Sequence, residues 1–425
     1  MPRSPILQSF VPARLSLMMF LQFFIWGAWY VTVGNYMAAN GLSHVIHWAY
    51  TVGPVSALIS PFVLGNLADR YVATERVLAV LNLVGGAAML GAALVGGSSA
   101  PAFIGLLFVH TFCFFPTPGL ANALIFHHVS DSERLYPLIR VFGSMGWIIA
   151  GVLVSLVLGA DETPIPMYLA GGTAVAMGLY CFTLPHTPPK GSRVDVTWRQ
   201  RLGLDAFDLL KRRPFLVFVL CELLISIPLS TYYAYAPVFV NAAGVENPGF
   251  QMSFGQVSEV LFMLFMPWVL VRLGVKRMMV VGFVAWLFRF ALMSLAAYHA
   301  GSYAFILAGI LLHGICFDFV YIAGEIFVNR QVTPEKRGQA QGLLVMMRSG
   351  VGMMIGAQIS GIMFNRLFIG ELTDMTGWVT FWMIPGVIAV AILVIFLVFF
   401  RDEGDGTWGR TGGQPAPAAR VSETL

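Results

Sequence analysis

Charged side chains are scarce in this sequence. Asp, Glu, Lys and Arg make up 11% of the 425 residues, whereas hydrophobic residues make up 58%. A soluble globular domain carries roughly 25% charged residues to cover its surface. The deficit excludes a soluble globule and indicates that lipid, rather than water, surrounds most of the folded chain.

Cysteines and catalytic motifs are also sparse. The four cysteines lie singly inside apolar runs without CxxC or CxxH spacing, which argues against a disulfide framework or a metal site. The sequence contains no HExxH pair, no GxSxG nucleophile elbow and no DDxxD-like carboxylate cluster. We therefore expect neither an enzyme nor a bound metal or cofactor. The cysteines are Cys113, Cys181, Cys221 and Cys316.

Long apolar runs are abundant instead. A membrane-spanning helix needs about 20 predominantly apolar residues, and twelve runs qualify. Six of them precede a polar stretch and six follow it, a layout typical of transporters built from two similar six-helix halves. The chain is therefore predicted to be an all-α membrane protein with twelve transmembrane helices in two pseudo-symmetric bundles. The runs are 15–38, 48–67, 76–96, 101–126, 138–159, 166–184, 214–240, 253–271, 277–298, 303–328, 340–366 and 377–400.

The same pattern predicts the boundaries of each region. The first run carries Trp26, Gly27 and Trp29 where a cleavable signal would have small residues, so we expect it to be the first span. The residues after 400 include few large apolar side chains and are predicted to be disordered. The expected regions are an N-terminus at 1–14, a first half at 15–184, a central loop at 185–213, a second half at 214–400 and a tail at 401–425.

Basic residues segregate to one side of these spans. With the N-terminus in the cytoplasm, 21 of the 25 Lys and Arg residues fall in cytoplasmic segments, three lie within spans and only Arg366 falls outside. This is the positive-inside pattern, and it predicts an inner-membrane protein with both termini in the cytoplasm. The net charge of +4 is thus explained by topology against the anionic leaflet and implies no nucleic-acid partner. We expect a monomer.

A polar motif follows the second span. Gly65-Asn66-Leu67-Ala68-Asp69-Arg70 resembles the loop signature between helices two and three of the major facilitator superfamily. The glycine permits two helix ends to approach closely, while Asp69 and Arg70 can form ion pairs on the cytoplasmic side. Gly65, Asp69 and Arg70 are therefore predicted to form a cytoplasmic gate. The alternative is an ordinary polar turn.

Ionisable residues also occur at membrane depth, where a charge costs roughly 2.5–3.5 kcal/mol on insertion scales. Glu259 and Asp318 stand out because of their neighbours. Gln256 lies three residues before Glu259 on the same helix face, and Asp318 follows His313 and Phe317, which are four residues apart. Amides, carboxylates and rings around one cavity suit a polar ligand with a flat ring. The remaining residues of this kind are Arg140, Glu222, Arg289 and Arg348, and for the last three a structural role is equally plausible.

A buried carboxylate can couple transport to protons. Burial raises the pKa of such a group, and a nearby arginine lowers it again. A carboxylate whose surroundings change between inward and outward states therefore binds and releases one proton in each cycle. Asp318 or Glu259 is the predicted carrier, with Arg140 as a partner across the two halves.

These residues carry a family resemblance. From Leu15 to Phe400 the chain resembles the nucleoside:proton symporters of the major facilitator superfamily, the NupG-type permeases. Two stretches look specific to that family, namely Leu202-Gly203-Leu204-Asp205-Ala206-Phe207 in the central loop and Phe317-Asp318-Phe319. Other matching stretches include Phe20-Leu21-Gln22-Phe23, Pro116-Thr117, Ile139-Arg140 and Ala340-Gln341-Gly342.

The resemblance implies proton-driven import of nucleosides through a central site. It places Arg140, Gln256, Glu259, Phe317 and Asp318 at that site, with a hydroxyl and an aromatic ring from Ser144 and Trp147. The chain departs from the family pattern at His313, where a tyrosine is expected, and in Leu229-Ser230-Thr231-Tyr232-Tyr233, where amides are expected. Tyr232 or Tyr233 is the predicted replacement for those amides.

These departures leave the substrate open. A permease for a purine base, a modified nucleoside or a sugar is the alternative within transport. A receptor that binds the ligand without moving it is a third possibility, although the short tails offer no room for a sensory domain.

Overall fold

The structure is a computed structural model that describes residues 10–65, 71–129, 131–189, 204–333, 336–368 and 371–401. Within these ranges the chain is helical and contains no β-strand. Several predictions fall outside the described residues. These are the gate residues Asp69 and Arg70, residues 190–203 of the central loop, and nearly all of the predicted tail.

The first six spans form one bundle, in which several spans are broken into two helical pieces. Span one consists of α2 and α3, and span four consists of α7 and α8. Spans two and five continue from an α-helix into a π-helical turn, η2 and η4. The bounds are α2 Val11–Trp29, α3 Val33–Ala39, α4 Ile46–Ser60, η2 Pro61–Gly65, α6 Thr74–Val95, α7 Ala100–Phe114, α8 Thr117–His128, α9 Ser132–Gly151, η4 Val152–Val157 and α10 Ile165–Cys181, with short 3-10 turns η1 Ser43–Val45 and η3 Gly96–Ser98.

The last six spans form the second bundle, which is preceded by the 3-10 helix η5 (Leu204–Lys211). Span ten is divided into α14, α15, η6 and α16, and span eleven into α17, η8 and α18. The bounds are α12 Arg213–Ala242, α13 Pro248–Tyr298, α14 Tyr303–Leu311, α15 His313–Phe317, η6 Asp318–Ile322, α16 Ala323–Gln331, α17 Arg337–Val345, η8 Met346–Gly352, α18 Met353–Leu367 and α19 Met375–Phe399.

The count of twelve spans follows from these helices. Nine stretches of the described chain are long and apolar enough to cross a membrane, and the shorter α10 is a tenth candidate. Helix α13 contains two predicted spans, because Gly274 with φ 70° and ψ 169° breaks it in the middle. The positive φ is accessible to glycine at little cost, so the chain turns there. Helix α4 with η2 supplies the remaining span.

The irregular turns occur where polar side chains lie in the membrane. The π-helical turn η6 begins at Asp318, and the π-helical turn η8 contains Arg348. A π-helical turn widens the backbone and is frequent at functional sites in transmembrane helices. In spans ten and eleven, the irregular turn and the buried polar residue therefore occur at the same place.

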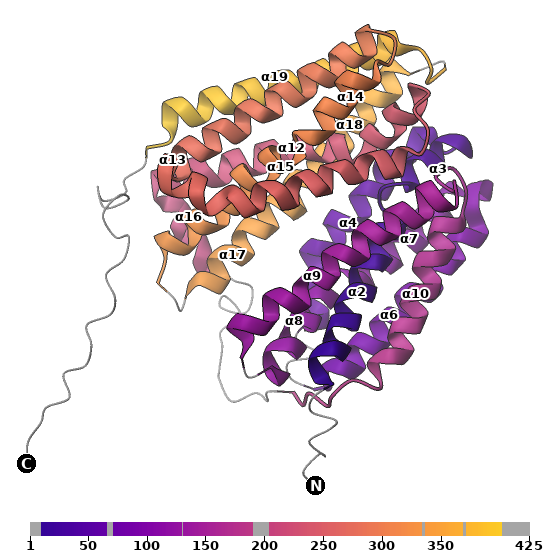
Figure 1. Ribbon diagram of the computed structural model, residues 1–425, viewed down its shortest axis with the longest axis vertical. Helices are drawn as coiled ribbons and strands as arrows, with labels where there is room; N and C mark the ends of the chain where they lie inside the picture. Colours follow the sequence, from indigo (N-terminus) through magenta and orange to yellow (C-terminus); the bar gives the residue numbers. More distant parts are fainter. Residues whose placement is uncertain are drawn as a thin grey trace, which may run out of the picture.

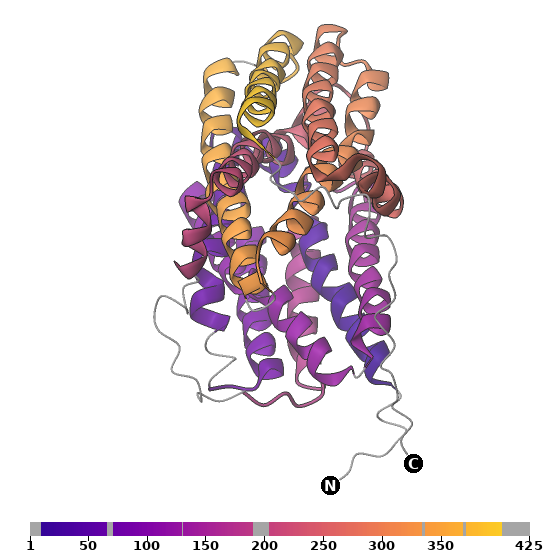
Figure 2. The ribbon, with the colours of Figure 1, turned by 90° about the vertical axis from the view of Figure 1, so that its left-hand side faces the viewer.

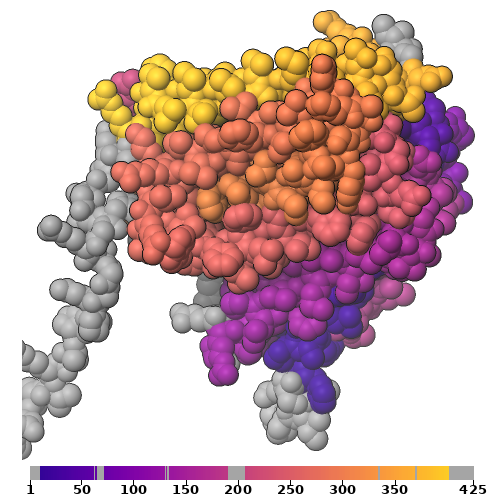
Figure 3. Space-filling model, turned by 45° about the horizontal axis from the view of Figure 1, so that its top comes forward, coloured from indigo at the N-terminus to yellow at the C-terminus, as the bar shows by residue number. Residues whose placement is uncertain are grey.

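The two bundles lie one above the other in two perpendicular views (Figures 1 and 2). Their ribbons converge where α3 and α4 meet α12 and α18, and diverge toward α8 and α17 (Figure 1). The space-filling view shows the two halves packed directly against each other along part of their length (Figure 3). Within the first bundle, α2 and α9 touch so closely that a Cβ on Gly146 would collide with the carbonyl oxygen of Phe20.

Hydrogen bonds between the halves gather at the converging end, which we call the closed end. The carboxylate of Asp161 accepts from the backbone N–H of Gly249 at 2.9 Å, and Asn241 Nδ2 donates to Glu162 Oε1 at 2.6 Å. Gln358 also donates to Thr51 at 2.7 Å. The opposite end, where α8 and α17 diverge, we call the open end.

Candidate binding cavity and buried charges

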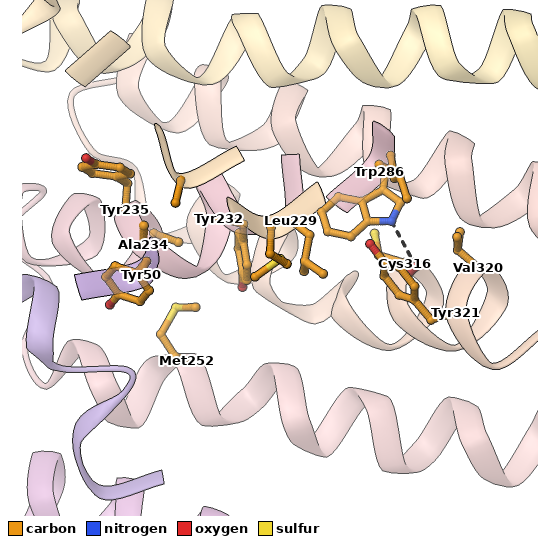
Figure 4. Packing of buried hydrophobic residues seen from close by; sticks show 14 of the residues in the cluster. Tyr50, Leu229, Tyr232, Ala234, Tyr235, Met252, Trp286, Cys316, Val320 and Tyr321 are labelled. Atoms are coloured by element: carbon orange, nitrogen blue, oxygen red, sulfur yellow. Dashed lines mark hydrogen bonds between the residues drawn. The ribbon is translucent and has the colours of Figure 1, made fainter. Parts of the chain in front are cut away.

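A small cavity lies between the two halves. The N-terminal half contributes aromatic rings, including Tyr30 and Trp147, and the C-terminal half contributes Gln256 and His313. Met252 also lines the cavity, and Figure 4 shows its side chain directed toward Tyr50 and Tyr232. Four of the predicted site residues therefore share one cavity. The full lining is Tyr30, Val31, Trp147, Tyr232, Tyr233, Pro237, Met252, Gln256 and His313.

The rings around this cavity form a continuous set. Tyr30 lies 6.4 Å from Trp147 and 6.0 Å from Tyr233, measured between ring centroids. His313 stacks on Tyr232 at 5.9 Å and on Phe317 at 5.8 Å. Such faces can hold a flat ring between them while polar groups orient it.

A chain of charged and polar side chains runs behind the rings. Arg289 Nη2 lies 2.8 Å from His313 Nδ1, and His313 Nε2 lies 3.5 Å from Glu259 Oε2. The guanidinium of Arg289 also lies 3.8 Å above the Tyr232 ring. Arg289 and His313 are fully buried, whereas the Glu259 side chain is 24% exposed. The sequence left the role of Arg289 undefined, and no spacing rule joins residues 24 positions apart.

Asp318 lies deeper than these residues. Its side chain is completely buried, and neither carboxylate oxygen has a hydrogen-bond partner. Trp286 fixes the preceding turn by donating from Nε1 to the carbonyl of Cys316 at 3.1 Å (Figure 4). A buried carboxylate without a partner is costly when charged, so this position is chemically suited to binding a proton.

Arg140 and Ser144 lie on the side of α9 near the open end. The Arg140 guanidinium stacks over the Phe23 ring of its own half at 4.2 Å, and Ser144 is exposed. Among the described residues, no ion pair joins Arg140 to Glu259 or Asp318 in this conformation. Arg140 nevertheless interacts electrostatically with Glu259 across the interface.

A second, larger cavity shares Tyr30 and Tyr233 with the first. Phe317 and Arg348 line it together with rings from both halves. Behind its wall, Arg348 Nη2 donates to Glu325 Oε1 at 2.6 Å. The sequence identified Arg348 as an ionisable residue in the membrane but gave it no partner, because π-helical turns shift which residues face each other.

Glu222 completes this second polar cluster. It is fully buried on α12, and a Cβ on Gly324 would lie 2.5 Å from its Oε1. It interacts electrostatically with Arg348. Of the predicted gate, only Gly65 is described, as the last residue of η2.

Sequence comparisons place this arrangement among transporters. The family model "Nucleoside H+ symporter" matches residues 10–405. The putative nucleoside transporter YegT of Escherichia coli K12 is 35% identical over 402 residues, which cover 92% of this chain and 94% of that protein. The xanthosine permease of the same organism is 30% identical over 412 residues, covering 93% and 97%.

Structural comparison agrees. The crystal structure of the nucleoside transporter NupG matches with a TM-score of 0.83 at 29% identity, covering 92% of this chain and all of that one. The POT family transporter PepTSo, at 13% identity and a TM-score of 0.69, shares the fold alone. With its twelve helices in two bundles and a cavity between them, this chain is a membrane transporter rather than an enzyme, and it belongs to the nucleoside H+ symporter family.

Proposed function

We propose that this protein imports nucleosides by proton symport, through alternating access of its two six-helix halves. The observation that carries the proposal is the cavity at the interface, where rings from both halves face Gln256 and His313. Buried carboxylates lie beside this cavity in the C-terminal half. The names of the relatives, which include a nucleoside permease and a xanthosine permease, point to the same class of substrate.

Each predicted residue has a role in this proposal. Trp147, Tyr232 and Phe317 stack on the base or the sugar ring, and Gln256 and Glu259 form hydrogen bonds with its polar atoms. His313 belongs to the same site and acts there through Glu259. Arg140 and Ser144 lie nearer the open end and reach the substrate when the halves close around it. Asp318 carries the proton, with Glu259 as a second candidate, and the proton gradient is the energy source.

The charge distribution supports an orientation. The basic loops place both termini and the 185–213 loop in the cytoplasm of an inner-membrane protein. In that orientation the closed end faces outward, the open end faces the cytoplasm, and Gly65, Asp69 and Arg70 form the cytoplasmic gate between the halves 15–184 and 214–400. The protein functions as a monomer in the bilayer and has no nucleic-acid partner.

Uptake in cells that lack their own nucleoside permeases tests the proposal. Labelled uridine and adenosine should accumulate, and a protonophore should abolish accumulation because it removes the gradient. Uptake that resists the protonophore would contradict proton symport. Sugar uptake with no nucleoside uptake would overturn the choice of substrate.

A modified nucleoside is the second candidate substrate. His313 stands where a tyrosine is expected in the family, and it lies directly against Tyr232. An imidazole and a phenol offer different hydrogen-bond donors and acceptors. Competition of labelled uridine uptake by a panel of modified nucleosides, purine bases and sugars distinguishes these substrates.

A further inference from the structure

Arg289 is a fully buried cation whose contacts all lie inside the C-terminal half. Its Nε donates to the carbonyl of Gly309 at 3.1 Å, and its guanidinium lies over the rings of Tyr232 and Trp286. Its Nη2 lies 2.8 Å from His313 Nδ1. A buried charge requires such compensation, but the contact with His313 has a chemical consequence of its own.

An arginine can only donate hydrogen bonds, since its guanidinium has no acceptor. His313 Nδ1 must therefore accept, with its lone pair directed at Arg289. A neutral imidazole carries one proton, so that proton is on Nε2. Arg289 thus selects one of the two neutral tautomers of His313.

The Nε2–H of that tautomer points toward Glu259. His313 Nε2 lies 3.5 Å from Glu259 Oε2, slightly longer than a normal hydrogen bond, and makes no hydrogen bond to any other described residue. The charged and titratable groups around the ring are Arg289 and Glu259 on α13 and Tyr232 and Tyr233 on α12. Stacking on Tyr232 and Phe317 fixes the plane of the ring, so Nε2 stays directed at the carboxylate.

We propose that Arg289 and His313 are positioning residues that orient Glu259 through a hydrogen-bond chain of fixed direction, from Arg289 to His313 to Glu259. The chain assigns one carboxylate oxygen, Oε2, to His313 and leaves Oε1 available to the solute. The orientation of Glu259 is independent of what the protein carries, whereas its effect on uptake rests on the proposed function.

The chain predicts which substitutions preserve it. In His313→Gln the side-chain oxygen can accept from Arg289 while the amide N–H donates to Glu259, so the direction of the chain is retained. His313→Leu removes both contacts and replaces the imidazole with an apolar side chain of similar volume. Arg289→Lys keeps a donor-only cation, and Arg289→Met removes it.

Solid-state NMR of the full chain in lipid, labelled with ¹⁵N-histidine, tests the tautomer directly. The His313 signals are those that disappear in His313→Gln. We expect one unprotonated and one protonated nitrogen, with the proton on Nε2. A proton on Nδ1 alone, or on both nitrogens, would overturn the proposal whether or not the protein carries nucleosides.

Uridine uptake tests the effect on Glu259. We expect His313→Leu to raise KM about tenfold with little change in kcat, which corresponds to about 1.4 kcal/mol of binding, and His313→Gln to stay within about twofold. Arg289→Met should add nothing in the His313→Leu background, because the chain is already broken. Equal KM values for the Gln and Leu variants would contradict the chain. If Arg289→Met does not yield folded protein, Arg289→Lys and the two His313 variants decide.

Discussion

The two halves of this transporter share a six-helix plan but differ in the chemistry of their interiors. The C-terminal half buries Glu222, Arg289, His313 and Asp318. The N-terminal half has buried contacts between neutral groups, such as Gln22 with Thr117 at 2.7 Å and Ser56 with Thr111 at 2.9 Å. Its buried ionisable groups, His47, Glu75, His110 and Asp161, do not line either of the two cavities. One half thus offers a largely aromatic wall, and the other offers groups that can change charge.

This difference has a mechanical meaning. Charged groups within one rigid bundle keep their mutual distances when the halves rock against each other, so their hydrogen bonds survive the cycle. The cycle changes instead the access of these charged groups to water and to the N-terminal half. We therefore expect substitutions in the C-terminal half to affect coupling, and substitutions in the N-terminal wall to affect binding alone.

Asp318→Asn should have the largest effect. Without a proton-binding carboxylate, accumulation of uridine driven by a pH gradient should fall to the equilibrium level, while exchange across the membrane persists. The measurement compares gradient-driven uptake with counterflow in proteoliposomes. Unchanged accumulation would show that Asp318 is not the proton carrier, and loss of both activities would indicate a binding role.

Arg348→Met tests the second polar cluster. Removing the cation leaves Glu325 and the fully buried Glu222 without their positive partner. Breaking a buried ion pair costs about 3–5 kcal/mol, and we expect the lower end of that range because the Glu325 side chain is 41% exposed. Thermal unfolding of the purified protein measures the loss.

The double variant Arg348→Met with Glu325→Gln is the matched control for this cluster. The Glu325→Gln change removes one of the two carboxylates that lack a positive partner once Arg348 is gone, so part of the lost stability should return. If Arg348→Met were as stable as the wild type, the cluster would contribute nothing to the stability of the C-terminal half.

Trp147→Ala tests the aromatic wall of the N-terminal half. Stacking of a base on an aromatic ring contributes about 1–3 kcal/mol, so KM for uridine should rise about tenfold. The protonophore should still abolish accumulation, because Trp147 contributes an aromatic ring to the cavity and no group that binds a proton. Trp147→Phe retains a ring and should lose less. A change in coupling would contradict the division between the halves.

The sequence predicted much of this arrangement but not all of it. Hydropathy located the twelve spans because each must satisfy its backbone inside lipid, although the break at Gly274 falls within one continuous helix, α13. Residue spacing placed Gln256 beside Glu259, and His313 stacked on Phe317 as expected. Contacts between distant spans, such as Arg289 with His313, have no local signal, because tertiary packing alone determines them.

Conformation is a further limit on prediction. The family resemblance grouped Arg140 with Gln256 and Glu259. In this structure Arg140 interacts electrostatically with Glu259, but its guanidinium stacks on Phe23 and, among the described residues, forms no ion pair with that carboxylate. A sequence encodes every state of an alternating-access cycle at once, and a single structure describes one of them. We therefore expect contacts predicted from the sequence to agree with a single structure more often within one half than across the interface.

The smallest expected effect, and the most specific one, concerns the closed end. There the carboxylate of Asp161, in the N-terminal half, accepts a hydrogen bond from the first turn of α13. Burial raises the pKa of Asp161 above its ordinary 3.8, even though Ser155 Oγ and the Gly249 N–H donate to the carboxylate. Opening would expose Asp161 to water and return its pKa toward the ordinary value. The closed state thus binds the proton more tightly, and it should weaken as pH rises through the raised pKa.

Asp161→Asn should therefore favour the closed end and remove its pH dependence, since the amide keeps an acceptor for Gly249 without the cost of a buried charge. Asp161→Ala should open it, because both hydrogen bonds are lost. The reporter is Thr32→Cys, since Thr32 is buried against Gly249 and the four native cysteines are all buried. Its reaction with a membrane-impermeant maleimide should slow about two- to fivefold in the Asn variant and quicken in the Ala variant, as expected for a change of about 1 kcal/mol. Faster labelling in the Asn variant would mean that the charge itself, attracted by the start of α13, holds the two halves together at this end.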